Sequence, residues 1–151
     1  MNFEDYVINN NPYKWTIESN HPTEWLNGCD ELLINFKRFE IITKYLKKIF
    51  VEKKKVLDLG VYPGITPKLM NEFFPGKDLI LKFYGLGIGF HEEFIEEMKK
   101  INVELLEADL DPRISKKLIS KKIDISDNSI ELTIFTDVIE HFYDPFYVLK
   151  E

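Results

Sequence analysis

The pattern of hydrophobic and polar positions changes character twice along the chain. Residues 1 to about 29 show neither a helical nor a strand period and contain both tryptophans, so we expect an irregular arm there. From Asp30 to Ile49, apolar side chains recur at steps of three and four residues, which predicts an amphipathic helix with Asp30 as its N-cap. Residues 1–50 are therefore interpreted as an N-terminal arm and helix.

After a polar break at residues 52–55, short apolar runs alternate with helical patterns. The runs are continuously apolar, as in strands that are covered on both faces. Such an alternation is typical of parallel βα units, so the sequence predicts an α/β fold, Rossmann-like, with a mostly parallel sheet flanked by helices. Thr66 and Pro67 predict the N-cap and the first residue of the first of these helices. The predicted strands are 56–59, 79–84, 103–107 and 130–135, and the predicted helices are 67–74, 91–101, 113–121 and one that begins near Asp137.

Composition narrows the class of protein. With 151 residues the chain is long enough for one compact domain. Its net charge of −6 argues against nucleic acid as the main partner. A single cysteine, Cys29, excludes an internal disulfide, and the acidic N-terminus and short apolar runs match neither a signal peptide nor a membrane span. We therefore predict a cytoplasmic protein without a membrane partner.

The loops that follow the predicted strands are where a parallel sheet binds ligands. The first loop, in VLDLGVYPGITP, has Asp58 near the strand end, Gly60 at the turn and Gly64 before the helix. Glycines let a ligand approach the backbone, and the following helix offers unpaired N–H groups. The same residues also suit a tight turn without a ligand, so this loop alone leaves both interpretations open.

The second loop is a rival candidate for a dinucleotide-binding turn. Glu104 and Glu107 follow it near the distance expected for a ribose-binding acid. Phe90, however, stands where the third glycine of the dinucleotide fingerprint belongs. The loop reads YGLGIGF and contains Gly85, Gly87 and Gly89.

The third and fourth loops carry polar side chains. Asp109 follows the third predicted strand, where its carboxylate can accept a hydrogen bond from an exocyclic amine or a ribose, or can cap the turn closed by Pro112. Beyond the fourth predicted strand, Asp137, Glu140 and His141 share one helical face, because they are spaced by three and four positions. The polar residues after that strand are Thr136, Asp137, Glu140 and His141.

The order of these loops is more specific than any one of them. VLDLGxxxG, YGLGIG, EADL and DNSIELTIFTDVIEHFYDPFYVLKE follow one another with suitable spacing, and residues of about 50–151 resemble the class I S-adenosylmethionine-dependent methyltransferases, in particular the type 11-like domain. The resemblance implies a sheet with strand order 3-2-1-4-5-7-6 and S-adenosylmethionine as the cofactor. It also implies methyl transfer to an acceptor, which we expect to be a small molecule.

The resemblance assigns roles to individual residues. The turn at 58–64 matches the turn that passes against the methionine and ribose parts of the cofactor. Asp109 and Leu110 match the position that contacts adenine, and Thr136 falls near the sulfonium. In two departures from the family, Tyr62 replaces a common middle glycine and Gly87 replaces the acid that binds the ribose hydroxyls. The implied cofactor-binding residues are Asp58, Gly60, Tyr62, Gly64, Gly87, Asp109, Leu110 and Thr136.

His141 is the candidate catalytic base, because an unperturbed imidazole titrates near neutral pH. A structural hydrogen bond at a helix start is its alternative role. The face formed by Asp137, Glu140 and His141 resembles a group that in some relatives binds a divalent metal or lies near the acceptor, and we assign no metal ligand. Two other functions stay open: a noncatalytic S-adenosylmethionine-binding scaffold, and a nucleotide-dependent oxidoreductase built on the Gly85 loop.

The resemblance also changes what the length means. Four of the seven family strands are accounted for by Phe135, so we expect the domain at 51–151 to be incomplete at its C-terminus. In the family's strand order the other strands belong beside the fourth, which leaves the apolar edge of 130–135 without a neighbour. We therefore predict either a truncated product of a longer gene or a homo-oligomer that covers this edge.

Overall fold

The computed structural model describes residues 40–42, 44–49, 51–62, 64–74, 77–109, 125–136 and 138–150. The predicted arm at 1–29, the N-cap Asp30, the predicted helix at 113–121 and the residues Leu110 and Asp137 lie outside these ranges. None of the helices in the described ranges combines the length and apolar character needed to cross a membrane.

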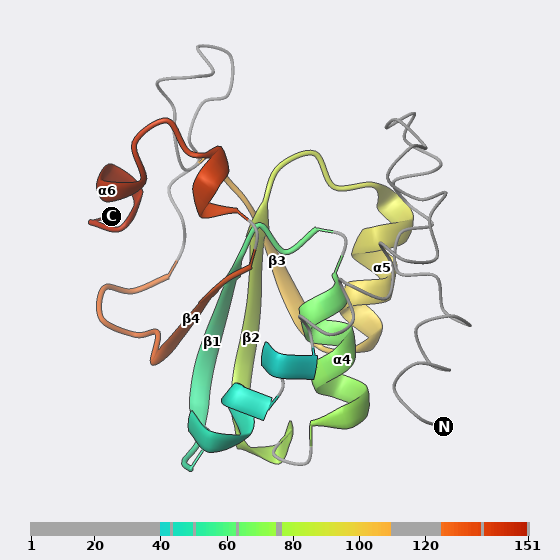
Figure 1. Ribbon diagram of the computed structural model, residues 1–151. Coiled ribbons are helices and arrows are strands. Elements are labelled where there is room, and N and C mark those ends of the chain that lie inside the picture. The colour runs from blue at the N-terminus through green and yellow to red at the C-terminus, as the bar shows by residue number, and fades with distance from the viewer. Residues whose placement is uncertain are drawn as a thin grey trace.

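The described chain forms a parallel sheet with helices on its faces (Figure 1). The four strands have the order β3-β2-β1-β4, and every neighbouring pair is parallel. This confirms the predicted α/β, Rossmann-like fold. Residues 40–42 and 44–49 are helical, and the later elements are β1 (Lys54–Leu59), α4 (Ile65–Phe73), η2 (Lys77–Leu79), β2 (Ile80–Gly87), α5 (Glu92–Lys100), β3 (Val103–Glu107), β4 (Leu132–Phe135), η3 (Ile139–His141) and α6 (Pro145–Val148).

Side chains alternate between the two faces of the sheet, as the pleat requires. Helices α4 and α5 cover one face, and η3 and α6 lie on the other side (Figure 1). The larger core cluster, on the α4 and α5 side, is Leu46, Val56, Val61, Met70, Phe74, Phe83, Phe94, Met98, Val103 and Ile134. Leu59, Leu86 and Ala108 form a smaller cluster. Leu46 belongs to the larger cluster, so the helix at 44–49 contributes to this core, whereas Tyr45 and Ile49 of the predicted apolar stripe are exposed.

Several predicted boundaries differ from the structure by one to three residues, and two of the differences bear on the site. Strand β2 continues to Gly87, three residues beyond the predicted end at Tyr84, because the glycine segment keeps its pairing with β1 and β3. Helix α4 begins at Ile65 with Gly64 as its N-cap, so the prediction of Thr66 as N-cap is wrong. The side chain of Thr66 is instead buried and hydrogen-bonded to Asp58.

The predicted fourth helix is also interrupted. Residues 139–141 form one turn of 3-10 helix, after which Phe142 is extended, with φ −79° and ψ 136°. A separate helix, α6, then starts at Pro145, and its N-cap Asp144 accepts a hydrogen bond from the backbone N–H of Tyr147 at 2.9 Å. The Asp-Pro pair thus marks a new helix start.

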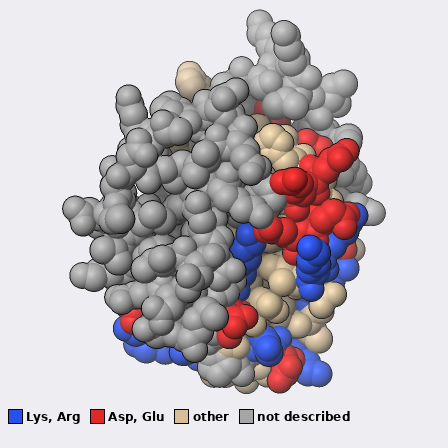
Figure 2. All heavy atoms as spheres, turned by 90° about the vertical axis from the view of Figure 1, so that its right-hand side faces the viewer, with Lys and Arg blue, Asp and Glu red and all other residues tan. Residues whose placement is uncertain are grey.

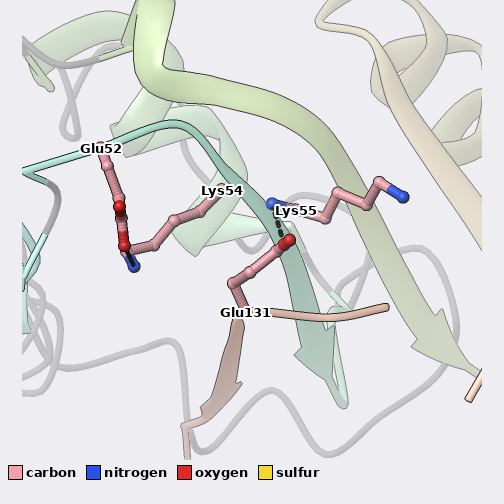
Figure 3. Close-up of polar contacts among 4 residues, drawn as sticks. All are labelled: Glu52, Lys54, Lys55 and Glu131. Atoms are coloured by element: carbon pink, nitrogen blue, oxygen red, sulfur yellow. Dashed lines mark hydrogen bonds and ion pairs between the residues drawn. The ribbon is translucent and has the colours of Figure 1, made fainter. Parts of the chain in front are cut away.

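A side chain completes the pairing at the start of β1 and β4 (Figure 3). The N–H of Lys55 donates to the Glu131 carboxylate at 2.7 Å, and the N–H of Glu131 donates to the carbonyl of Lys55 at 3.2 Å. Lys54 and Glu52 form a separate ion pair at 3.2 Å, in which only Glu52 is largely exposed. The carboxylate of Glu131 therefore supplies an acceptor that a longer β4 would supply from its backbone.

Glu131→Ala is expected to lower the free energy of unfolding by about 1–2 kcal/mol, because the Lys55 N–H loses a charged acceptor. Glu131→Gln keeps an acceptor oxygen at the same place and is expected to lose less than half as much. Urea unfolding of both variants beside the parent chain measures the difference. Equal losses in the two variants would contradict a role for this hydrogen bond.

Candidate functional site

The strand order locates the ligand-binding edge of the sheet. β1 lies between β2 and β4, and the connection from β1 to β2 through α4 runs away from β4. Strand order therefore reverses between β1 and β4, and ligands of open parallel sheets bind beyond the carboxyl ends of the strands at such a point. The turn after β1 and the segment after β4 are the loops that border it.

The turn after β1 is held firmly to the end of β2. The N–H groups of Gly60 and Val61 both donate to the carbonyl of Leu86, at 2.9 and 3.1 Å, and the N–H of Gly64 donates to the carbonyl of Val61 at 2.6 Å. Gly60 and Gly64 have φ of 72° and 83°, in the left-handed region that favours glycine. The backbone of this turn is therefore fixed by the chain itself.

Close packing is a second reason why positions 60 and 64 require glycine. A Cβ at Gly60 would lie 2.5 Å from Cγ2 of Val138, which places the turn after β1 directly against the segment after β4. A Cβ at Gly64 would lie 2.8 Å from Cε of Met98 and 2.9 Å from Cε2 of Phe94 on α5. The structure thus brings together the two loops that the sequence predicted as neighbours in a site, with the start of α4 pressed onto α5.

Asp58 lies beneath this turn, with 2% of its side chain exposed. Burial raises the pKa of Asp58 from 3.8 to about 8, and the hydrogen bond from the side chain of Thr66 opposes this rise by a smaller amount. The carboxyl group is therefore mostly protonated at pH 7. Since Asp58 precedes the turn and Thr66 follows it, their hydrogen bond closes the base of the loop.

The second glycine segment lies beside a carboxylate of the next strand. Gly87 is paired in register with Glu107 of β3, and Glu107 Oε1 accepts a hydrogen bond from the N–H of Gly89 at 3.0 Å. The sequence associated Glu107 only with a dinucleotide site. Its position next to Gly87 depends on the register between β2 and β3. The sequence indicated only that Glu107 ends the third predicted strand and that Gly87 follows the second.

Tyr62 packs toward the beginning of α5. Its half-buried ring meets Phe94 edge-on, with 5.2 Å between the ring centroids, and lies 6.5 Å from the ring of His91. Asp109 and Thr136 are half-buried at the ends of β3 and β4. The carboxyl edge of the sheet therefore carries most of the predicted cofactor-binding residues, although Leu110 lies outside the described residues.

His141 is exposed at the end of η3, next to the exposed Glu140. The predicted shared face with Asp137 is not described, because Asp137 lies outside the described ranges. Within those ranges, no group of three or more His, Cys, Asp or Glu side chains is arranged to hold a metal ion.

A groove of about 600 Å³ lies at the opposite edge of the sheet, at the amino ends of β2 and β3. Ile80, Phe83 and Val103 contribute apolar surface to it. Two of its lysines are already paired, Lys82 with Glu104 and Lys99 with Glu96. This groove therefore does not coincide with the glycine turn. Because ligands of open parallel sheets bind beyond the carboxyl ends of the strands, the candidate site is assigned to the edge with the glycine turn.

Acidic side chains gather on the face that α5 presents (Figure 2). Glu92 and Glu93 occupy the first turn of α5, which begins at the carboxyl edge of the sheet, whereas Lys99 and Lys100 occupy its last turn at the opposite edge. With Glu107, these carboxylates make the candidate site edge negative, which favours a cationic ligand over an anionic one.

No protein-family model, curated protein or solved structure matches this chain. The α/β fold is shown by the order and direction of the strands.

Proposed function

We propose that the chain binds S-adenosylmethionine at the carboxyl edge of the sheet and serves methyl transfer to a small-molecule acceptor. The observation that carries the proposal is the glycine turn after β1, which is fixed in left-handed conformations at the point where strand order reverses. Its contact with Val138 joins it to the loop after β4. The negative carboxyl edge suits the sulfonium and ammonium charges of this cofactor.

The half-buried polar side chains at the strand ends supply the remaining contacts. Asp109 would accept a hydrogen bond from the adenine amino group, and Thr136 would lie near the amino acid portion. Tyr62 would bound the site on the α5 side, since its ring already packs against Phe94.

The ribose hydroxyls need an acid that position 87 does not provide. Glu107 is the nearest replacement, because it is paired in register with Gly87 and already accepts the N–H of Gly89. A carboxylate can accept hydrogen bonds from two vicinal hydroxyls while it keeps a backbone donor. Glu107 would therefore hold the ribose from β3.

When bound, the cofactor supplies an activated methyl group whose sulfur leaves as a neutral thioether. The chain's own contribution is alignment of the acceptor with the methyl group and exclusion of water. His141 would take the proton of an acceptor that must lose one, and its exposed position at the end of η3 leaves it accessible to an acceptor from solvent.

A noncatalytic cofactor-binding domain is the second candidate. Tyr62 and Gly87 favour it, since the ring adds bulk at the turn and the glycine removes the usual ribose contact.

The homo-oligomer that would cover the edge of β4 also stays a prediction. Among the described residues β4 pairs with β1 alone, and the following segment exposes 76% of Tyr143 and 77% of Phe146.

Titration calorimetry of the full chain tests the proposal, with S-adenosylmethionine, S-adenosylhomocysteine and the nicotinamide dinucleotides as separate ligands. Binding of the first two alone is expected. Glu107→Gln is expected to weaken both by about 10- to 100-fold, because a neutral amide replaces a charged acceptor. Glu104→Gln is the matched control, since Glu104 lies at the other end of β3 and pairs with Lys82, and its affinities should match those of the parent chain.

Saturating concentrations that give no heat with either sulfur compound would overturn the proposal. Release of S-adenosylhomocysteine in the presence of pooled acceptors separates a catalytic chain from a binding domain, and only the former produces it.

A further inference from the structure

Among the described residues, Asp58 is the only buried side chain that can carry a charge. Its neighbours in the sheet are Gly85 on β2 and Ile134 on β4, neither of which titrates. The side chain of Thr66, in the first turn of α4, is its hydrogen-bonding partner. The carboxyl group thus lies in an apolar setting, one residue before the last residue of β1 and two before the turn.

Within the described ranges, the elements packed on this face bring no compensating charge to Asp58. Titratable side chains of the helix at 44–49, of α4 and of α5 are exposed, except Lys68 and Glu97, which form an ion pair with each other at 2.5 Å. Two further titratable groups, Tyr62 in the turn and His91 before α5, lie near the turn, with 6.5 Å between their rings. Only burial and the Thr66 hydrogen bond account for the shift in the pKa of Asp58.

We propose that Asp58 holds a proton in the unliganded chain and releases it when a sulfonium cofactor binds at the adjoining turn. This inference rests on the proposed function. Asp58 precedes Gly60 by two residues, so their Cα atoms are at most about 7 Å apart. A positive charge bound against the turn, in a partly buried site, would stabilise the ionised carboxylate.

The cofactor and its product should differ in their effect on Asp58. S-adenosylhomocysteine lacks the sulfonium charge, so it should stabilise the ionised form of Asp58 much less. Because proton release and ligand binding are reciprocally linked, S-adenosylmethionine should bind roughly tenfold more tightly at pH 8 than at pH 6. The product's affinity should change much less, so rising pH favours replacement of product by cofactor.

Calorimetry of the full chain at pH 7, in phosphate and in Tris, measures the protons released, because the two buffers differ in ionisation enthalpy. Roughly 0.5–0.9 proton is expected for each S-adenosylmethionine bound, and close to none for S-adenosylhomocysteine. Asp58→Asn removes the titrating group, so the parent chain should release more protons than this variant. The comparison separates the proton of Asp58 from any proton that the cofactor's own ammonium loses.

A second variant keeps the test decisive if Asp58→Asn does not bind. Thr66→Val removes the hydrogen bond that favours the carboxylate, so the pH at which proton release is half-maximal should rise. An unchanged midpoint, equal proton release by the parent and Asp58→Asn, or binding by the parent without proton release would each overturn the inference. Absence of binding overturns the proposed function itself, and the two failures are therefore distinguishable.

Discussion

Asp58→Asn is expected to stabilise the folded chain at neutral and alkaline pH. The folded-state pKa of Asp58 is about 8, and its ordinary value is 3.8, so the folded chain binds the extra proton between these values. Stability contributed by the protonated group is complete below the lower value and is lost as the pH rises through the upper one. The folding equilibrium constant of the parent chain should therefore fall almost tenfold per pH unit up to about pH 8.

The neutral amide of the variant carries no such dependence. From pH 5 to pH 8, the variant should gain roughly 3–4 kcal/mol relative to the parent chain, which is a large share of the stability of an ordinary domain. Urea unfolding at several pH values measures the gain. Asp78→Asn makes the same chemical change at an exposed position and should leave the parent's pH dependence unaltered. Parallel pH profiles for the parent and Asp58→Asn would show that Asp58 is ionised in the folded chain.

Gly64→Ala is expected to lower the free energy of unfolding by roughly 2–5 kcal/mol. About 1–2 kcal/mol comes from the left-handed backbone, with φ 83°. A further 1–3 kcal/mol or so comes from overpacking, since the new Cβ would lie 2.9 Å from Phe94. The ring of Phe94 is fully buried and contacts the rings of Phe90 and Tyr62, so it has little room to move.

Gly89→Ala is the matched control for this prediction. Gly89 has a similar φ of 66°, but a Cβ there would have no neighbour within 4 Å. Its loss should therefore be the backbone contribution alone, about 1–2 kcal/mol. Chemical denaturation of the two variants under the same conditions gives both losses. Equal losses would contradict the overpacking expected between the start of α4 and α5.

The strands were predictable from the sequence because each is a continuous apolar run. Strand β3, at Val103–Glu107, has the predicted bounds, and the order of β1 to β4 follows the resemblance to the methyltransferases. The end of β2 was not predictable from local preference, since glycines are depleted in strands. Here Gly85 is needed inside the strand, because a Cβ would lie 2.8 Å from Val61.

The site was predictable only where it depends on chain order. The turn with Gly60 and Gly64 could be predicted from its glycine pattern before a helix, and the structure has it at the carboxyl edge of the sheet, as expected. The positions of Glu107 beside Gly87 and of Thr66 beneath the turn depend on tertiary packing. Hydrogen bonding to a buried acid takes precedence over the local preference of threonine for the N-cap.

The hydrogen bonds within the turn after β1 also limit how well its backbone could bind a phosphate group. A phosphate-binding loop presents its backbone N–H groups to the anion. In this turn the N–H groups of Gly60, Val61 and Gly64 are already donated to carbonyl oxygens of the chain. Pro67, in the first turn of α4, contributes no N–H at all. These four positions therefore offer a pyrophosphate no free backbone donor, and under the proposed function their backbone would favour a nucleoside ligand without phosphates.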